Sequence, residues 1–238
     1  MSKNVQATNR SRALYNQLKD DDYPIDKYPA RIITDSYLRL EASLQGTITA
    51  ITFNMLVTQG SPNCTENRLN ITDRFCAASW AMFIMKAGAT VAATQAEISV
   101  ARPRTFNNSQ VFTGAGEAAN LEVMYNSQLK VTVDSTVYID SYDTRRFYRV
   151  PTSMQGAAVS TVATTGVLNA DGYDESGYPF AGLTPSITFS GIGKNLIQLT
   201  LPNPTSLIGT NSQNFVVLWL RGYLIQNVNQ SPNQRRRN

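Results

Sequence analysis

The sequence predicts an all-β protein with a jelly-roll sandwich or barrel fold. Apolar and polar residues alternate in several short segments, these segments are rich in β-branched and aromatic residues, and Pro- or Gly-containing turns separate them. About nine to eleven strands are expected, without an internal repeat. We favour a single barrel with extensions. A compact double jelly roll is the alternative, but its roughly sixteen strands would use nearly all of residues 31–226.

Residues 1–30 are expected to form a basic N-terminal arm. A short helix is predicted over residues 12–19, where Leu14 and Leu18 lie one turn apart. Pro24 and Pro29 then favour an extended chain. We expect this arm to be ordered only where another surface holds it.

The segments after the arm are expected to form the first strands of the barrel. Strands begin near Ser36, and Thr47–Thr58 is rich in β-branched residues. Leu69–Ala87 is the most apolar segment and fits either a helix or a strand. Because alternation gives it two apolar faces, we favour a strand buried between two layers. A short strand is predicted at 94–101 and a loop at 105–120.

Leu129–Val150 is the segment around which we expect the barrel to be organised. Its odd positions from Leu129 to Ile139 are mostly apolar and its even positions are polar, which is the period of a half-buried strand. One long strand is predicted. The alternative is a hairpin with a tight turn at Asp134 and Ser135, which would place Val131 and Val133 on the face opposite Val137 and Ile139.

Three strands are predicted in the last quarter of the chain. A short one covers Ile187–Ser190, and a second covers Asn195–Leu201 and ends at Pro202. The last, Asn214–Gln226, is long and apolar, which is typical of a central strand, and Gly222 within it suggests a bulge.

Positive charge is concentrated at the two ends of the chain. The net charge is +4, and without four cations at the N-terminal end and three at the C-terminal end it would be −3. The jelly-roll body is expected at 31–227 and a basic C-terminal tail at 228–238. The cations of the arm and the tail are Lys3, Arg10, Arg12, Lys19, Arg235, Arg236 and Arg237. Such ends make sequence-independent contacts with the phosphates of nucleic acid or lipid headgroups, or else merely aid solubility.

The sequence offers little for catalysis or metal binding. It has no histidine, so nucleophiles activated by histidine are excluded. Cys64 and Cys76 make neither a disulfide scaffold nor a zinc site. The candidate carboxylates for acid–base or calcium chemistry are Asp134, Asp140, Asp143, Asp171, Asp174 and Glu175. Arg145 and Arg146 are expected to neutralise the first three, and the last three lack the spacing of a calcium loop. We therefore predict that the protein is not an enzyme and has no cofactor or metal site.

Two further features limit the possible classes of protein. No apolar run approaches 18 residues, so no membrane-spanning segment is expected, and the polar N-terminus shows no secretory signal. A cluster of four aromatic residues could stack on a sugar or base, but aromatic residues on strands are more often core or cross-strand pairs, which is the favoured interpretation. These residues are Phe147, Tyr148, Trp219 and Tyr223.

Several segments together carry a resemblance to a known family. They are Leu38-Arg-Leu, the strand TITAITFNMLVT, the run Arg68–Phe75, the block Val137–Pro151 and the terminal FVVLWLRGYLIQ. These segments resemble jelly-roll virion proteins of tailless bacteriophages, notably those with an internal membrane that infect aquatic bacteria. The resemblance implies a capsid protein that is made in the host cytoplasm and located in the virion, where its copies assemble as trimers and its arms run beneath the shell. Major capsid, penton and minor capsid roles stay open.

The expected function is therefore that of a structural protein that forms an icosahedral capsid by self-assembly. Its partners would be copies of itself, in a trimer, and other virion proteins, with non-specific contact to nucleic acid or membrane lipid through the basic arms and no small-molecule substrate. Residues 152–184 have little periodicity and are predicted to contact a neighbouring subunit. The contact residues expected there are Tyr173, Tyr178, Pro179 and Phe180. The alternative is a receptor- or carbohydrate-binding attachment module that uses this loop for recognition.

Overall fold

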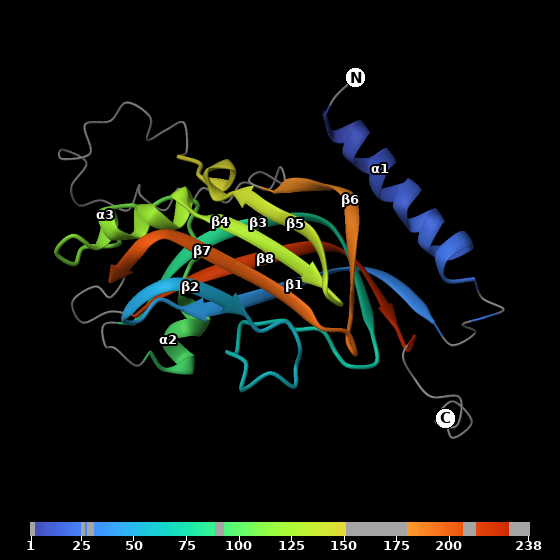
Figure 1. Ribbon diagram of the computed structural model, residues 1–238, viewed down its shortest axis with the longest axis horizontal. Coiled ribbons are helices and arrows are strands. Elements are labelled where there is room, and N and C mark those ends of the chain that lie inside the picture. Colours follow the sequence, from blue (N-terminus) through green and yellow to red (C-terminus); the bar gives the residue numbers. More distant parts are fainter. Residues whose placement is uncertain are drawn as a thin grey trace.

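The computed structural model describes residues 3–24, 27, 31–88, 93–150, 180–206 and 213–228. They form two four-stranded antiparallel sheets that pack against each other (Figure 1). The first sheet contains, in spatial order, β1 (Ile32–Ser43), β8 (Gln213–Gln226), β3 (Arg74–Ala87) and β6 (Ala181–Ser190). The second contains β2 (Thr47–Phe53), β7 (Asn195–Ser206), β4 (Gln128–Val133) and β5 (Thr136–Asp143).

This strand order is that of one eight-stranded jelly roll. Every connection between consecutive strands crosses from one sheet to the other, except the β4–β5 hairpin. The predicted all-β jelly-roll fold is confirmed. The described ranges hold eight strands, fewer than expected, and they form a single barrel.

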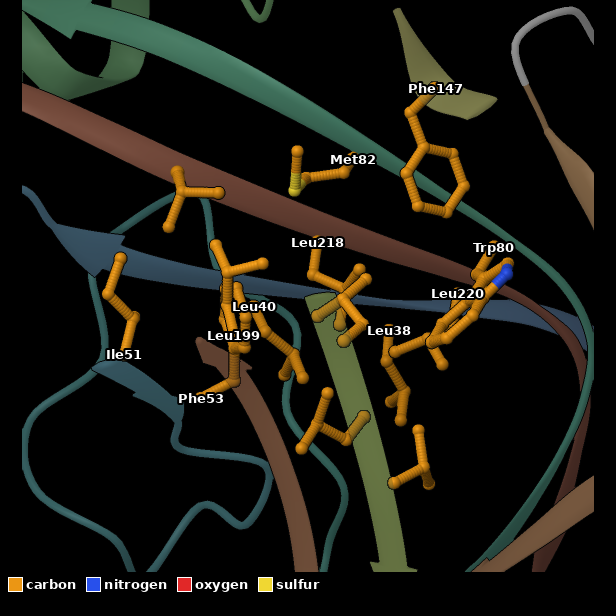
Figure 2. Packing of buried hydrophobic residues seen from close by; sticks show 14 of the residues in the cluster. Leu38, Leu40, Ile51, Phe53, Trp80, Met82, Phe147, Leu199, Leu218 and Leu220 are labelled. Atoms are coloured by element: carbon orange, nitrogen blue, oxygen red, sulfur yellow. The ribbon is translucent and has the colours of Figure 1, made fainter. Parts of the chain in front are cut away.

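The core lies between the two sheets and follows the two-residue period of the strands. Leu38 and Leu40 of β1, Leu218 and Leu220 of β8, and Trp80 and Met82 of β3 point inward, and each is at most 2% exposed. Figure 2 shows these side chains meeting Ile51 and Phe53 of β2 and Leu199 of β7. Full burial of each large side chain contributes roughly 1.5–3 kcal/mol, so this layer supplies most of the stabilisation of the barrel.

The strands around which the first sheet is built are β3 and β8, not the predicted Leu129–Val150. The predicted strand at 69–87 is confirmed as β3, which lies between β8 and β6. The predicted final strand is confirmed as β8, which is central. A Cβ on Gly222 would lie 1.9 Å from the Cys76 carbonyl oxygen, so only glycine fits there. The bulge itself falls in β3, where Ala78 has no partner in the register.

β4 and β5 form a hairpin over residues 128–143, so the prediction of one long strand over Leu129–Val150 is wrong. Asp134 and Ser135 both have positive φ, 48° and 74°, which makes the two-residue turn that suits a hairpin. A regular hairpin would have placed Ile139 on the face opposite Val131 and Val133, but register irregularities in the β4–β5 pairing prevent this. The register slips beside Tyr138, so Val137 is exposed while Ile139 packs on the core. β5 is an edge strand.

The predicted strand at 94–101 is wrong, because this segment forms the short helix α2 (Gln95–Val100). The Thr94 hydroxyl accepts from the Glu97 amide at 3.3 Å, and the Glu97 carboxylate accepts from the Thr94 amide at 2.8 Å. This reciprocal capping box stabilises a helix start. The predicted loop at 105–120 is interrupted by α3 (Glu117–Glu122), which a 3-10 turn, η2 (Val123–Asn126), follows.

Two boundaries in the second half of the chain also differ from the prediction. β7 continues past Pro202 to Ser206, because its prolines lie where the pairing with β2 jumps from Thr200 to Thr205 and no ladder hydrogen bond is needed. β6 begins at Ala181, inside the segment predicted as a loop. Residues 151–179 of that loop lie outside the described residues.

The predicted N-terminal helix is confirmed and is longer than expected. α1 (Lys3–Gln17) continues into a single π-helical turn, η1 (Leu18–Asp22). Figure 1 shows α1 against the side of the barrel, next to β6. After β5, a 3-10 turn, η3 (Thr144–Phe147), closes the described part of the β5–β6 connection.

Candidate interaction surfaces

The outer face of the first sheet carries an apolar cluster that the N-terminal helix covers. We call it the arm cluster. Its buried members are Leu18, Tyr23, Cys76, Ile225 and Val228, with Leu14, Ile33 and Tyr223 packed against them. Every one of these residues comes from η1, from α1 or from the outward positions of β1, β3 and β8 and their flanks. The second layer over β3 is therefore supplied partly by the arm.

Polar contacts fix α1 in register over this cluster. The Tyr223 hydroxyl donates to the Ser11 carbonyl at 2.9 Å, and its ring lies 5.7 Å from that of Tyr15. Burial raises the pKa of the Tyr223 phenol, and Asp35 adds to the shift, so the hydroxyl stays protonated and can donate. Arg10 donates to the Thr184 hydroxyl of β6. The arm is thus tied to the central strand β8 and to the edge strand β6.

The structure describes four of the seven predicted arm cations, all of them in α1 and η1. Arg10, Arg12 and Lys19 are exposed on α1 and η1. Lys3 begins α1. Arg235, Arg236 and Arg237 lie outside the described residues. Sequence reasoning missed Arg221 on β8, which is exposed on the same outer face, although the strand alternation could have revealed it.

Both extensions leave the barrel at one end. Ile32, the first residue of β1, pairs with Gln226, the last of β8. The Asn227 amide then donates to the Asp73 carboxylate at 3.0 Å, and Val228 is buried in the arm cluster. The N-terminal arm and the C-terminal tail therefore join the barrel side by side.

A second apolar cluster covers the other half of the same outer face. Its members are Ala81, Phe83, Met85, Ala87, Ile98, Phe215 and Val217, with Ala93, Ala101, Phe180 and Trp219 partly buried against them. The Phe180 ring lies 6.3 Å from Trp219 and 6.4 Å from Phe83, with the Arg221 guanidinium 5.3 Å from its centre. Phe180, predicted as an exposed loop aromatic, is instead half-buried on its own barrel. Tyr173, Tyr178 and Pro179 lie outside the described residues, and the subunit-contact role of the four stays a prediction.

The other predicted aromatic residues do not form one stacking platform. Phe147 is buried against Trp80 and Tyr142, and Tyr148 packs on Tyr125. Trp219 and Tyr223 lie on the opposite side of the first sheet. The core and cross-strand interpretation is confirmed.

The candidate carboxylates of the hairpin serve the fold. Asp134 accepts from the Lys194 amide at 2.8 Å, and Asp143 accepts from the Arg145 amide at 2.8 Å. Asp140 pairs with Lys130 at 2.8 Å, so its neutralising partner is not Arg145 or Arg146 as predicted. Asp171, Asp174 and Glu175 lie outside the described residues.

Other acidic side chains that the sequence analysis did not single out are buried in structural networks. Glu41 accepts from Arg39, Asn63 and Thr65 at 2.7–2.9 Å. The Glu117 carboxylate is 2.9 Å from Lys86 and also accepts from the Gly114 amide and from Asn214. These networks hold the β2–β3 and β3–β4 connections against the barrel.

A pocket of about 430 Å³ lies beside α2. Its polar lining is Lys86, Glu97, Arg102 and Arg104. Lys86 pairs with Glu117, and the Glu97 carboxylate accepts from the Thr94 amide. Two of the four polar side chains therefore already stabilise the local structure. In the described ranges, no group of three or more His, Cys, Asp or Glu side chains could hold a metal ion.

Loss of the arm should be detectable at Cys76, which is fully buried beneath it. Burial raises the pKa of the Cys76 thiol, although hydrogen bonds with Ser186 and Thr188 oppose the shift, so it reacts slowly. In a Cys64→Ser background, Leu18→Ala should remove part of the docking energy and accelerate Cys76 modification by at least about tenfold, since core Leu→Ala changes cost about 2–5 kcal/mol. Ellman's reagent measures the rate.

The matched control for this experiment is Leu196→Ala on the other sheet. Leu196 is 38% exposed, so its loss should leave the Cys76 rate unchanged. Equal rates in the Leu18 and Leu196 variants would mean that Cys76 is reached by opening of the barrel itself, not by release of the arm.

Comparison with protein-family models, curated proteins and solved structures finds no match to this chain. Among the described residues, no helix is both long and apolar enough to cross a membrane.

Proposed function

We propose that the protein is a structural component of a virion shell, assembled from copies of itself, with its basic arms toward the interior and no catalytic role. The observation that carries the proposal is the pairing of Ile32 with Gln226. Because both extensions join the barrel at the same end, a layer of barrels in one orientation would bring seven arm cations per copy to one side. Sequence-independent attraction to phosphates then follows, whether in a packaged genome or in lipid headgroups.

The low charge of the chain supports the same proposal. Charged residues make up 16% of the sequence, against about 25% in typical proteins. Among the described residues, the ion pairs Arg39–Glu41, Arg68–Glu66 and Lys86–Glu117 are largely buried, and the residues that β2, β4 and β7 show to solvent are mostly uncharged, such as Thr, Gln and Ala. Surfaces of this kind lose little solvation energy when they pack against other protein surfaces.

Neutralising the arm cations tests this function without uncovering the arm cluster, which deletion of α1 would do. Arg12→Gln and Lys19→Gln change exposed side chains, and Arg10, which holds α1 to Thr184, is left in place. Together they should weaken binding to double-stranded DNA or to vesicles of anionic lipid, and reduce the slope of log K against log salt by up to about 0.9 per lost DNA contact. Comparing DNA with vesicles identifies which phosphate source the arms prefer.

The control replaces two barrel cations, Arg145 and Lys194, with Gln. These changes should leave binding to polyanions nearly as it was, because the arms are intact. Light scattering and electron microscopy of the full chain test the shell itself, with a defined oligomer or closed particle expected. A chain that stays monomeric, or one whose binding depends on the barrel cations, would refute the proposal, and specific glycan binding by the monomer would favour an attachment module.

A further inference from the structure

The apolar inner row of β3 and β8 ends in a polar pair. Ile84 of β3 pairs with Val216 of β8 in the core, and the next pair in the same row is Lys86 with Asn214. Because side chains alternate along a strand, Lys86 and Asn214 point to the same inner face, and directly opposed residues have Cβ atoms about 4.5–5.5 Å apart. Glu117, the first residue of α3, contacts both side chains. We call Lys86, Glu117 and Asn214 the buried triad.

In the buried triad, one carboxylate bridges the amine and the amide. Glu117 Oε2 accepts from Lys86 Nζ at 2.9 Å, and Glu117 Oε1 accepts from Asn214 Nδ2 at 2.8 Å. The Gly114 amide donates to Oε2 at 2.7 Å and helps to fix the carboxylate. The side chain of Glu117 is 0% exposed, that of Lys86 is 17% exposed, and Asn214 is 1% exposed. The amine and the amide are therefore held against the two oxygens of one buried carboxylate.

We infer that the buried triad forms an intramolecular amide bond between Lys86 and Asn214, with Glu117 as the proton carrier. Lys86 Nζ gives a proton to Glu117 and, as a neutral amine, attacks the side-chain carbon Cγ of Asn214. The Cγ–Nδ2 bond breaks, and the leaving nitrogen takes the proton held by Glu117 and a second proton lost from Nζ. A lysine ammonium and an asparagine amide thus become one secondary amide and one ammonium ion, so atoms, electrons and charge balance. The step occurs once in each chain and has no external substrate.

The surroundings of the buried triad favour this reaction. Both hydrogen bonds of Glu117 lie within the roughly 2.6–3.2 Å over which a side chain exchanges a proton with a reacting group. Burial favours the first proton transfer, because a neutral amine and a neutral acid cost less desolvation than an ion pair. Well-oriented groups within one molecule react as if at an effective concentration of up to about 10⁵–10⁸ M. Lys86 also lines the pocket beside α2, which gives the ammonium a route to solvent.

A second buried network in the chain has the same bridging geometry but a different cation. One oxygen of Glu41 accepts from Arg39 at 2.8 Å and the other accepts from Asn63 at 2.9 Å. A guanidinium keeps its proton in proteins and does not attack an amide, so the Glu41 network only stabilises the fold. A buried ion pair contributes little net stability compared with an apolar pair. Stability alone therefore does not account for a lysine at the end of an apolar row, whereas bond formation requires one.

Mass spectrometry of the intact full chain tests the bond. The wild-type mass should be lower than that of the sequence by one ammonia, and trypsin should not cleave after Lys86, because an acylated lysine has lost the charge that trypsin binds. Proteolysis at other sites should release a fragment in which Lys86 is joined to Asn214. Succinimide formation at an asparagine also releases ammonia, but it leaves Lys86 cleavable and gives no joined fragment.

Two conservative variants and a matched control assign the roles within the buried triad. Lys86→Arg keeps the charge but removes the nucleophile, so the loss of ammonia should disappear. Glu117→Gln keeps the shape but removes the proton acceptor, and it should slow bond formation at least about a hundredfold, since general acid–base catalysis contributes about 10²–10⁴-fold. Glu122→Gln, in the same helix and 45% exposed, should form the bond at the wild-type rate.

The wild-type measurement decides the inference even where a variant fails to fold. A folded wild-type chain that keeps the full mass of its sequence after prolonged incubation would overturn it, and so would a loss of ammonia that persists in Lys86→Arg. A joined Lys86–Asn214 fragment in the wild type, absent from Lys86→Arg, establishes the bond. Neither result depends on shell assembly, which light scattering tests separately.

Discussion

Trp80→Ala should cost about 3–5 kcal/mol of the free energy of unfolding, the range observed for removal of a fully buried aromatic side chain. Trp80 is fully buried in β3, with Tyr142 at 4.8 Å and Phe147 at 5.8 Å between ring centres. Its loss leaves a cavity where the hairpin and η3 meet the first sheet. Figure 2 shows Phe147 of η3 close to Trp80. For a chain of this size the melting temperature should fall by about 6–20 °C.

The chain offers a matched control at Trp219. This residue lies on the outer face of the same sheet, half-buried against Tyr37 and Phe83. Trp219→Ala should be clearly milder, because its neighbours are nearer to solvent and can relax. Trp80→Phe should also be milder than Trp80→Ala, since the indole Nε1 has no hydrogen-bond partner within the described structure and phenylalanine removes that buried donor. Equal losses in Trp80→Ala and Trp219→Ala would mean that the core does not lie between the sheets.

The strands that the sequence predicted correctly are those whose pattern of apolar residues is set by burial alone. β3 and β8 are apolar on both faces, and few structures other than a strand between two layers accommodate that pattern. The sequence could not show what the second layer is. Leu14 and Leu18 of a polar helix supply part of it, and their spacing is too weak a signal to identify the surface that they cover.

The errors arose where a local contact outweighs periodicity. Asp134 and Ser135 adopt positive φ without a glycine, and the slip at Tyr138 restores Ile139 to the core, so the hairpin left no trace in the alternation. The helix at α2 did leave a signal, because Thr94-Gln-Ala-Glu97 is a capping box, and the prediction of a strand at 94–101 overlooked it. β7 passes Pro202 because β2 does not need its amide hydrogen there.

The candidate surfaces were predictable to a smaller extent. Arm cations are visible in composition, but the joining of both extensions at one end depends on the pairing of β1 with β8, which involves residues nearly two hundred positions apart. Register, which no short segment encodes, was the missing information.

Glu117→Ala should destabilise the protein by about 3–5 kcal/mol, because it leaves a lysine largely buried without its counter-ion. The Glu117 side chain is fully buried and 2.9 Å from the Lys86 ammonium, whose side chain is 17% exposed. The same carboxylate accepts from the Gly114 amide at 2.7 Å and from Asn214 at 2.8 Å, so it joins α3 to both central strands. Denaturant unfolding monitored by circular dichroism measures the loss.

Glu122→Ala is the matched control for this prediction, in the same helix and with the same chemistry. Glu122 lies 3.4 Å from Arg145, and both side chains are about half exposed, at 45% and 46%, so solvent screens the pair and its loss should cost less than about 1 kcal/mol. Adding Lys86→Met to Glu117→Ala should recover part of the stability, because no uncompensated charge is then left buried. A double variant no more stable than Glu117→Ala would assign the loss to the hydrogen bonds with Gly114 and Asn214. In that case the carboxylate acts chiefly as an acceptor that anchors α3, and its charge matters little.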